Sequence, residues 1–129
     1  MSDEIQYSLE KLGKALASLK EGAEQAADDL SKDGVIQRFE FTFELLWKTL
    51  RIFLEEVKGI QVRNPKDSLK AAFKEGLIDD EKVFLNMLED RNRSSHIYNK
   101  EESQEIFKRV KSDYLPAVLK VLNTLKEKK

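Results

Sequence analysis

The chain contains no cysteine, and it has only two prolines, five glycines and one histidine among 129 residues. Without cysteine the protein has no disulfide bond, no thiolate nucleophile and none of the usual sulfur ligands of zinc. A β-sandwich needs more turn residues than these few glycines and prolines supply, so the composition is typical of long helices. A chain of this length has room for one hydrophobic core. We therefore predict a single all-α domain over residues 1–129.

Neither sign of charge is in excess, because 23 lysines and arginines face 24 aspartates and glutamates and the net charge is −1. No overall positive field therefore draws the chain to nucleic acid or anionic lipid, and any polyanion must be held by local groups. The sequence also lacks a run of about 18 apolar residues, which a membrane-spanning helix needs. Its start, SDEIQYSLEKLGKAL, lacks the features of a signal peptide. The expected location is the cytoplasm, with no membrane partner.

Apolar residues at spacings of three and four predict two long helices in the first half of the chain. The first covers about residues 3–30 and the second about residues 35–58, with the segment LSKDGV between them as a turn. The stripe of the first helix is also typical of a coiled-coil seam, but a bundle helix has the same pattern and we favour the bundle. The second helix is apolar around most of its surface, so we predict that it is buried on more than one side.

Clear capping signals mark two shorter helices. Asn64 suits an N-cap and Pro65 the first helical position of a helix that extends to about residue 74. Asp79 or Asp80 is expected to cap the helix that follows.

The last helix follows Asn99 and contains Pro116. A proline inside a helix removes one backbone hydrogen bond, so we predict a kink near residues 112–116. Acidic residues gather at 79–81 and at 101–102, where helix N-termini attract carboxylates, so we interpret them as caps and expect no metal site. The sequence has no glycine-rich loop that would hold a phosphate, and we expect no bound cofactor.

The stretch DRNRSSHIYN, residues 90–99, contains the only histidine of the chain. In one continuous helix Arg91 and His96 would lie about 140° apart around the axis and would not share a face, whereas Asn92 and His96 would. Arg91 and His96 can cooperate if the helix ends inside the motif, or if a second copy of the chain completes the site. An isologous contact in a two-fold dimer would bring two histidines and two arginines into one cleft.

Such a cleft has the groups that RNA cleavage without a metal requires. A neutral imidazole would take the proton from a ribose 2′-hydroxyl, which attacks the adjacent phosphorus, and an imidazolium would protonate the leaving 5′-oxygen. Arginine would stabilise the charge that develops on the phosphate. DNA lacks the 2′-hydroxyl, so we expect RNA and not DNA as the substrate. From its spacing alone, the motif is also compatible with a solvated helix end whose histidine has no catalytic role.

The segment RNRSSHIY, residues 91–98, matches the R-x4-H-x-Y motif of the HEPN superfamily. The segments RFEFTFELLWKTLRIFLE at 38–55 and NPKDSLKAAFKEGLI at 64–78 resemble the branch known as nucleotidyltransferase substrate-binding proteins. The resemblance extends over almost the whole chain. It implies an all-α, up-and-down antiparallel bundle of four to five helices that forms a homodimer, with a cognate minimal nucleotidyltransferase as its partner.

Related pairs act as toxin and antitoxin, and the resemblance implies roles for four residues of the motif. Arg91 and His96 would be the catalytic pair of a metal-independent endoribonuclease, and Asn92 the polar residue that follows the arginine. Tyr98 would accept AMP from the nucleotidyltransferase, which silences the toxin. The alternative is a non-catalytic subunit that presents a nucleotide or an acceptor group to the partner enzyme. The net charge of −1 favours the subunit, and the intact motif favours the ribonuclease, which is our leading hypothesis.

Overall fold

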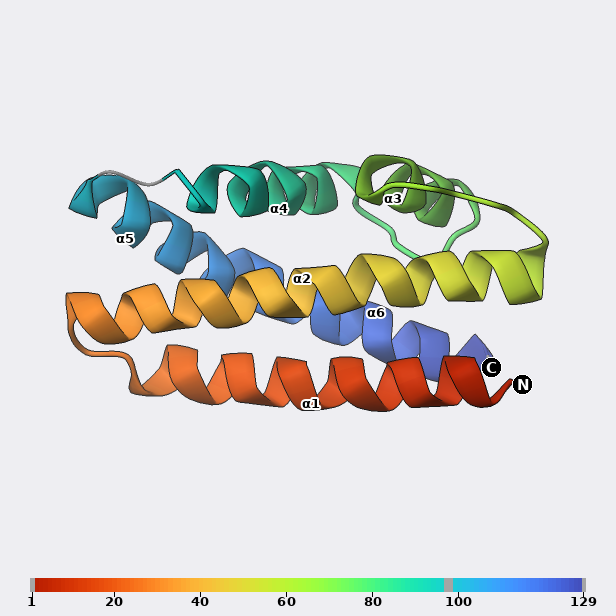
Figure 1. Ribbon diagram of the computed structural model, residues 1–129, viewed down its shortest axis with the longest axis horizontal. Coiled ribbons are helices and arrows are strands. Elements are labelled where there is room, and N and C mark those ends of the chain that lie inside the picture. The colour runs from red at the N-terminus through yellow and green to blue at the C-terminus, as the bar shows by residue number, and fades with distance from the viewer. Residues whose placement is uncertain (1, 97–98, 129) are drawn as a thin grey trace.

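The computed structural model describes residues 2–96 and 99–128, and within these residues the chain forms helices and no strand (Figure 1). In chain order the helices are α1 (Asp3–Gln25), α2 (Asp29–Lys58), α3 (Pro65–Lys74), α4 (Glu81–Ser94), α5 (Lys100–Arg109), the π-helical η1 (Val110–Tyr114) and α6 (Leu115–Lys128). Because α5, η1 and α6 follow one another without a break, the described chain has five helical segments. The expected all-α fold is confirmed. No described helix is both long enough and apolar enough to cross a bilayer.

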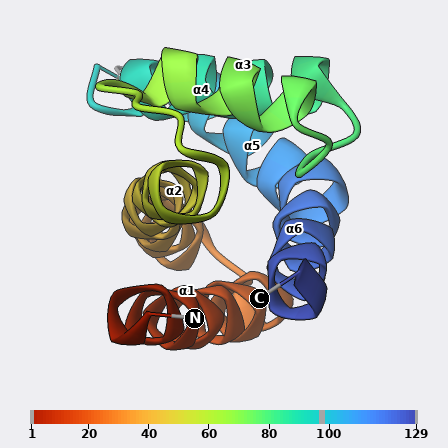
Figure 2. The ribbon, with the colours of Figure 1, turned by 90° about the vertical axis from the view of Figure 1, so that its right-hand side faces the viewer.

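Helix α2 is the central element of the bundle. Figure 2 shows α1 on one side of α2, α3 and α4 on the opposite side, and α5 and α6 along a third side. Along the long axis α1, α2, α4 and the α5–α6 segment run alternately in opposite directions (Figure 1), as an up-and-down bundle requires. The prediction that the second helix is buried on more than one side is confirmed. At most 2% of each of the following residues is exposed: Phe39, Phe43, Leu46, Leu50, Phe53 and Leu54.

The predicted turn at LSKDGV is wrong, because that segment forms the first part of α2. Helix α1 ends at Gln25 and α2 begins at Asp29, so the connection lies at residues 26–28. The Asp28 side chain accepts a hydrogen bond from the Ser31 N–H at 2.8 Å, and the Ser31 hydroxyl oxygen accepts one from the Asp28 N–H at 3.1 Å. This capping box starts the helix before the apolar spacing becomes regular. Leu30, at the end of the predicted first helix, is 82% exposed.

The predicted caps of α3 and α4 are confirmed. The Asn64 side chain accepts a hydrogen bond from the Asp67 N–H at 2.9 Å, and Pro65 is the first residue of α3. Asp80, one of the two expected residues, caps α4 by accepting a hydrogen bond from the Val83 N–H at 3.3 Å. These caps fix where α4 begins, and α4 then lies against α2.

A π-helical turn, η1, corresponds to the kink that Pro116 predicts. The Leu115 N–H donates to the Val110 carbonyl, five residues earlier, and Pro116 itself has no N–H to donate. The segment changes direction between α5 and α6 at this turn (Figure 2). It buries Tyr114, whose ring stacks on Phe39 with the two centroids 5.4 Å apart. The turn therefore brings a tyrosine hydroxyl into the region beside the end of α4.

Candidate functional site

Asp90 joins the C-terminal half of α4 to the last helical segment. Only 3% of the residue is exposed. Arg109 donates to both carboxylate oxygens, from Nε at 2.7 Å and from Nη2 at 2.9 Å, and the Tyr114 hydroxyl donates to Oδ2. A buried carboxylate is tolerated when it is paired and hydrogen-bonded in this way. These contacts therefore hold the Asp90 side chain in one position and anchor α4 to the last helical segment.

The same network holds its donors in the protonated form. Burial and the hydrogen bond to Asp90 raise the pKa of the Tyr114 hydroxyl, and the hydrogen bond to that carboxylate raises the pKa of the Arg109 guanidinium. At neutral pH both groups therefore donate to Asp90. Arg91 directly follows Asp90, so its side chain leaves α4 about 100° around the helix axis from this anchored carboxylate.

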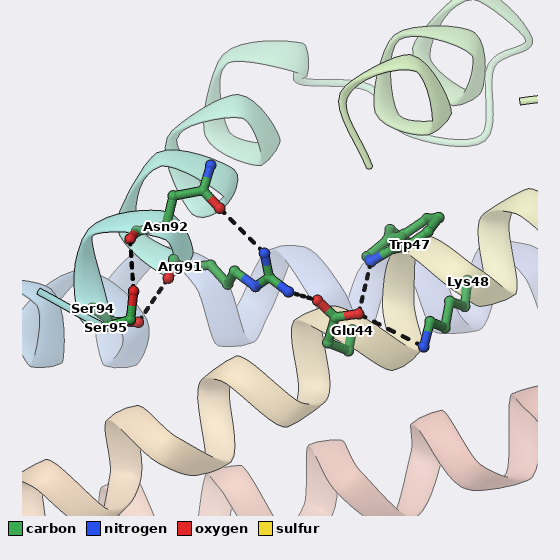
Figure 3. Close-up of polar contacts among 7 residues, drawn as sticks. All are labelled: Glu44, Trp47, Lys48, Arg91, Asn92, Ser94 and Ser95. Carbon is green, nitrogen blue, oxygen red and sulfur yellow. Dashed lines mark hydrogen bonds and ion pairs between the residues drawn. The ribbon is translucent and has the colours of Figure 1, made fainter. Parts of the chain in front are cut away.

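Arg91 reaches from α4 to α2, where it forms an ion pair with Glu44 (Figure 3). Glu44 also accepts a hydrogen bond from the Trp47 indole N–H at 3.1 Å, and its Oε2 lies 3.8 Å from the Lys48 ammonium. The guanidinium Nη1 of Arg91 donates to the Asn92 side-chain oxygen at 3.2 Å. The side chains of Arg91 and Glu44 remain 33% and 29% exposed, so a ligand can reach the pair.

Helix α4 ends between Arg91 and His96, which is one of the two arrangements that the sequence allows. Its last residue is Ser94, and Ser95 follows as the C-cap. The Ser94 hydroxyl donates to the Arg91 carbonyl at 2.8 Å, and the His96 N–H donates to the Arg93 carbonyl at 2.8 Å. These bonds satisfy carbonyl groups that a helix end leaves without a partner. The His96 side chain is exposed to solvent.

The structure gives no direct contact between the predicted catalytic residues Arg91 and His96 within the described part of one chain. Arg91 and Asn92 are in contact, but no hydrogen bond or ion pair within residues 2–96 and 99–128 joins the His96 side chain to either of them. The condition under which Asn92 and His96 would share a helix face is not met, because α4 ends at Ser94. Tyr98 lies outside the described residues.

The acidic residues near the motif lie at helix N-termini, but only one of them, Asp80, is a cap. Asp80 caps α4, and Glu101 and Glu102 lie in the first turn of α5. The Asn99 side chain, at the start of that helix, accepts a hydrogen bond from the Glu102 N–H at 2.9 Å. Across the part of the chain that the structure describes, no group of three or more His, Asp and Glu side chains is arranged to hold a metal ion.

The sequence pattern did not predict the two carboxylates that form the polar contacts of the site, Glu44 and Asp90. Glu44 lies 47 positions from Arg91, and Asp90 lies 19 positions from Arg109 and 24 from Tyr114. No local spacing connects residues so far apart. The available signals are weak: Glu44 is an acidic residue between the apolar residues Phe43 and Leu45, and Asp90 directly precedes the motif arginine.

Solved structures of other proteins share this fold. A crystal structure of a protein from Thermus thermophilus matches with a TM-score of 0.84 and 37% sequence identity, over 89% of this chain and 98% of that one. A protein from Haemophilus influenzae matches with a TM-score of 0.80 and 28% identity, over 92% of this chain and 98% of that one. The latter structure is described as revealing the fold of a substrate binding domain of a nucleotidyltransferase. The chain thus has the helical fold described for that domain.

The family model described as "Nucleotidyltransferase substrate binding protein like" matches residues 7–127. The chain therefore belongs to that family, and its expected place in the HepT-like branch of the HEPN superfamily is confirmed. A curated relative, "Probable ribonuclease HepT" from Haemophilus influenzae, is 31% identical over 86 residues. The match spans 64% of this chain and 58% of that relative, so it covers less than two thirds of the relative's length.

Proposed function

We propose that the chain is the HEPN-type toxin of a toxin–antitoxin pair, a metal-independent endoribonuclease whose site contains Arg91, Asn92 and His96. The observation that carries the proposal is the arrangement at the end of α4. A guanidinium, next to the buried anchor Asp90, and an exposed imidazole lie at this one helix end. The name of the Haemophilus relative, a probable ribonuclease, supports the same activity.

The reaction uses general acid–base chemistry on a phosphodiester. The neutral His96 imidazole takes the proton from the 2′-hydroxyl, and the 2′-oxygen forms a bond to the adjacent phosphorus. A protonated histidine gives its proton to the 5′-oxygen as the bond between phosphorus and that oxygen breaks. Arg91 stabilises the negative charge on the phosphate oxygens through paired hydrogen bonds. The products are a 2′,3′-cyclic phosphate and a 5′-hydroxyl.

The proposed site is formed by a homodimer. The chain has one histidine, whereas the reaction uses one imidazole as a base and another as an acid. A two-fold contact near the end of α4 would supply the second imidazole and a second guanidinium. The exposure of His96 supports this arrangement, because the imidazole is accessible to a second chain.

In this proposal the partner, a nucleotidyltransferase, inactivates the ribonuclease. A cognate minimal nucleotidyltransferase transfers AMP from ATP to the hydroxyl of Tyr98, and pyrophosphate leaves. Tyr98 belongs to the same motif as His96 and follows it by two positions in the sequence, so we propose that the added AMP blocks this motif. Toxin, partner and RNA would meet in the cytoplasm.

A second candidate function is a non-catalytic subunit that presents a nucleotide or an acceptor group to the nucleotidyltransferase. The contact between Arg91 and Glu44 favours it, because the charge of the guanidinium is already compensated by a carboxylate of the same chain. The net charge of −1 also favours it.

A cleavage assay with single-stranded RNA in excess EDTA separates the two functions. The toxin proposal expects cleavage that persists with the chelator and leaves 2′,3′-cyclic phosphate ends. Intact RNA in the presence of a folded chain that binds the nucleotidyltransferase would support the subunit instead.

A further inference from the structure

A groove between α1 and α2 concentrates positive charge. Three of its lining residues are cations, Lys11, Lys14 and Arg38, and no lining residue is aspartate or glutamate. The chain as a whole has a net charge of −1, so this groove differs in sign from the average of the protein. It is therefore a local site of the kind that could hold a polyanion.

Exposed aromatic rings accompany these cations. Phe41 lines the groove and is 59% exposed, although it is a large apolar side chain. Tyr7, one turn before Lys11 on α1, is 62% exposed, and the Lys11 ammonium lies 5.2 Å from the centroid of its ring. Exposed rings beside lysines are the groups on which single-stranded nucleic acids stack their bases and place their phosphates.

One of the cations is held in place by the bundle. The Arg38 guanidinium, from α2, donates to the Ser18 carbonyl of α1 at 2.7 Å. It also packs over Gly22, where an added Cβ would lie 2.8 Å from Arg38 Nη1. The glycine thus leaves the space that Arg38 needs to bridge the two helices. A preorganised cation of this kind loses less side-chain entropy when it binds a phosphate.

Along α2 the groove ends one residue away from Glu44, the carboxylate that contacts the proposed catalytic arginine. Leu45 of the groove directly follows Glu44 on α2, and Glu44 contacts both Lys48 and Arg91. Figure 3 shows Lys48 and Arg91 on either side of the Glu44 carboxylate. A chain of phosphates that crosses α2 beside Leu45 would therefore meet Lys48 and then Arg91.

We propose that the groove between α1 and α2 binds a single-stranded segment of the RNA substrate next to the scissile phosphate. This proposal rests on the proposed ribonuclease function. A second copy of the chain is a poor occupant, because a two-fold contact would set the same cations against one another. An acidic protein would satisfy the lysines but gives no reason for the exposed rings of Phe41 and Tyr7.

The test is the affinity of the full chain for a fluorescently labelled, single-stranded 2′-O-methyl oligonucleotide, measured by anisotropy. The blocked 2′-oxygen prevents cleavage, so binding is measured separately from activity. The double variant Lys11→Glu, Lys14→Glu should weaken binding by more than about tenfold, and the slope of log K against log salt should fall by about 0.7 for each phosphate that a lysine no longer neutralises. Phe41→Ala should weaken binding by about five- to a hundredfold, because one base loses its stacking partner.

The matched control is Lys66→Glu, Lys70→Glu, which makes the same change of charge on α3. Helix α3 lies on the opposite side of α2 from α1 (Figure 2), so this variant should keep nearly full affinity. Circular dichroism checks that all variants fold. Equal losses in the two double variants would overturn the proposal, and so would poly-glutamate binding as tightly as RNA.

Parallel cleavage of unmodified RNA distinguishes this inference from the function on which it rests. If the wild-type chain cleaves RNA but the groove variants bind and cleave normally, the groove assignment is wrong and the ribonuclease stands. If RNA binds through the groove and no RNA is cleaved, the binding site stands and the ribonuclease proposal is wrong.

Discussion

Glu44 and Arg91, which lie 47 positions apart in the sequence, form an ion pair where α2 meets α4. In the chain without RNA, the Glu44 carboxylate is therefore bound to the guanidinium that we propose as the binding group for the RNA phosphate. The substrate has to compete with this carboxylate for the same hydrogen-bond donors. The pair is partly exposed, and contacts of this kind contribute only about 0.2–1 kcal/mol, so a phosphate can displace it.

Glu44→Gln should increase the activity of the ribonuclease. Removal of the competing charge frees Arg91, and the cost of displacing the pair predicts a rise in kcat/KM of about 1.4- to fivefold. Steady-state cleavage of a short RNA measures the change, with Glu55→Gln on the exposed face of α2 as the control. A large loss of activity in Glu44→Gln would instead mean that the carboxylate holds Arg91 in its working position.

His96→Ala should abolish cleavage and leave the fold intact. Loss of general acid–base catalysis lowers rates by roughly 10²- to 10⁴-fold, whereas an exposed side chain contributes little to stability. Rates are compared with Ser95→Ala, a change at the preceding exposed residue, and melting temperatures are measured for both. Full activity in His96→Ala would remove the histidine from the mechanism.

A mixture of wild-type and His96→Ala chains should lose more activity than dilution of the wild-type chain explains. The proposed cleft uses two imidazoles, so a mixed dimer keeps both guanidinium groups but lacks either the base or the acid. With equal amounts of the two chains, random pairing leaves roughly one quarter of the dimers wild-type, and the cleavage rate should fall to about that fraction. Sedimentation measures the dimer in the same samples, and a rate close to half that of the wild type would place the whole site in one subunit.

Incubation with the nucleotidyltransferase, ATP and magnesium should add the mass of one or more AMP groups to the chain. Peptide mass spectrometry should locate the modification on Tyr98, and Tyr98→Phe should remain unmodified. Tyr7, which is exposed, and Tyr114, which is buried, serve as internal controls. A stable complex with an unmodified Tyr98 would favour the non-catalytic subunit.

Tyr114→Phe should destabilise the fold at neutral pH, and its effect should shrink in alkali. The variant loses the hydrogen bond to Asp90, which costs about 1–3 kcal/mol. The fold raises the pKa of Tyr114 above its ordinary value of 10.0, so its stabilising effect is complete below that pH and is lost as pH rises through the folded value. Urea unfolding of both proteins at pH 7 and above pH 10 measures the difference in free energy. If the difference in free energy of unfolding between the two proteins were the same at both pH values, folding would not change the pKa of the Tyr114 hydroxyl.

Local signals in the sequence were sufficient for much of the fold. Asn64, Pro65 and Asp80 act through neighbouring backbone groups, so their roles follow from residue type and order. The start of α2 was missed because Asp28 and Ser31 form a cap before the apolar pattern begins, and Leu30 within that first turn faces solvent.

The contacts of the candidate site depend on tertiary packing and could not be predicted. The motif identified Arg91 and His96, but the position of the Arg91 guanidinium is set by Glu44 on another helix. Likewise Asp90 is buried where Arg109, the last residue of α5, and Tyr114 of η1 lie against it. Spacing along one helix contains no information on which side chains a second helix supplies.

The π-helical turn also determines which side of α6 faces the core. The buried residues Ile106, Val110, Tyr114 and Val118 follow one another at intervals of four. In an α-helix each such interval drifts by about 40°, so the last side chain would face about 120° away from the first. The wider turn of η1 takes up part of that drift and keeps the four residues directed at the core. If these residues were α-helical throughout, the apolar side of α6 would turn away from the core, so η1 selects which side chains of α6 meet α1.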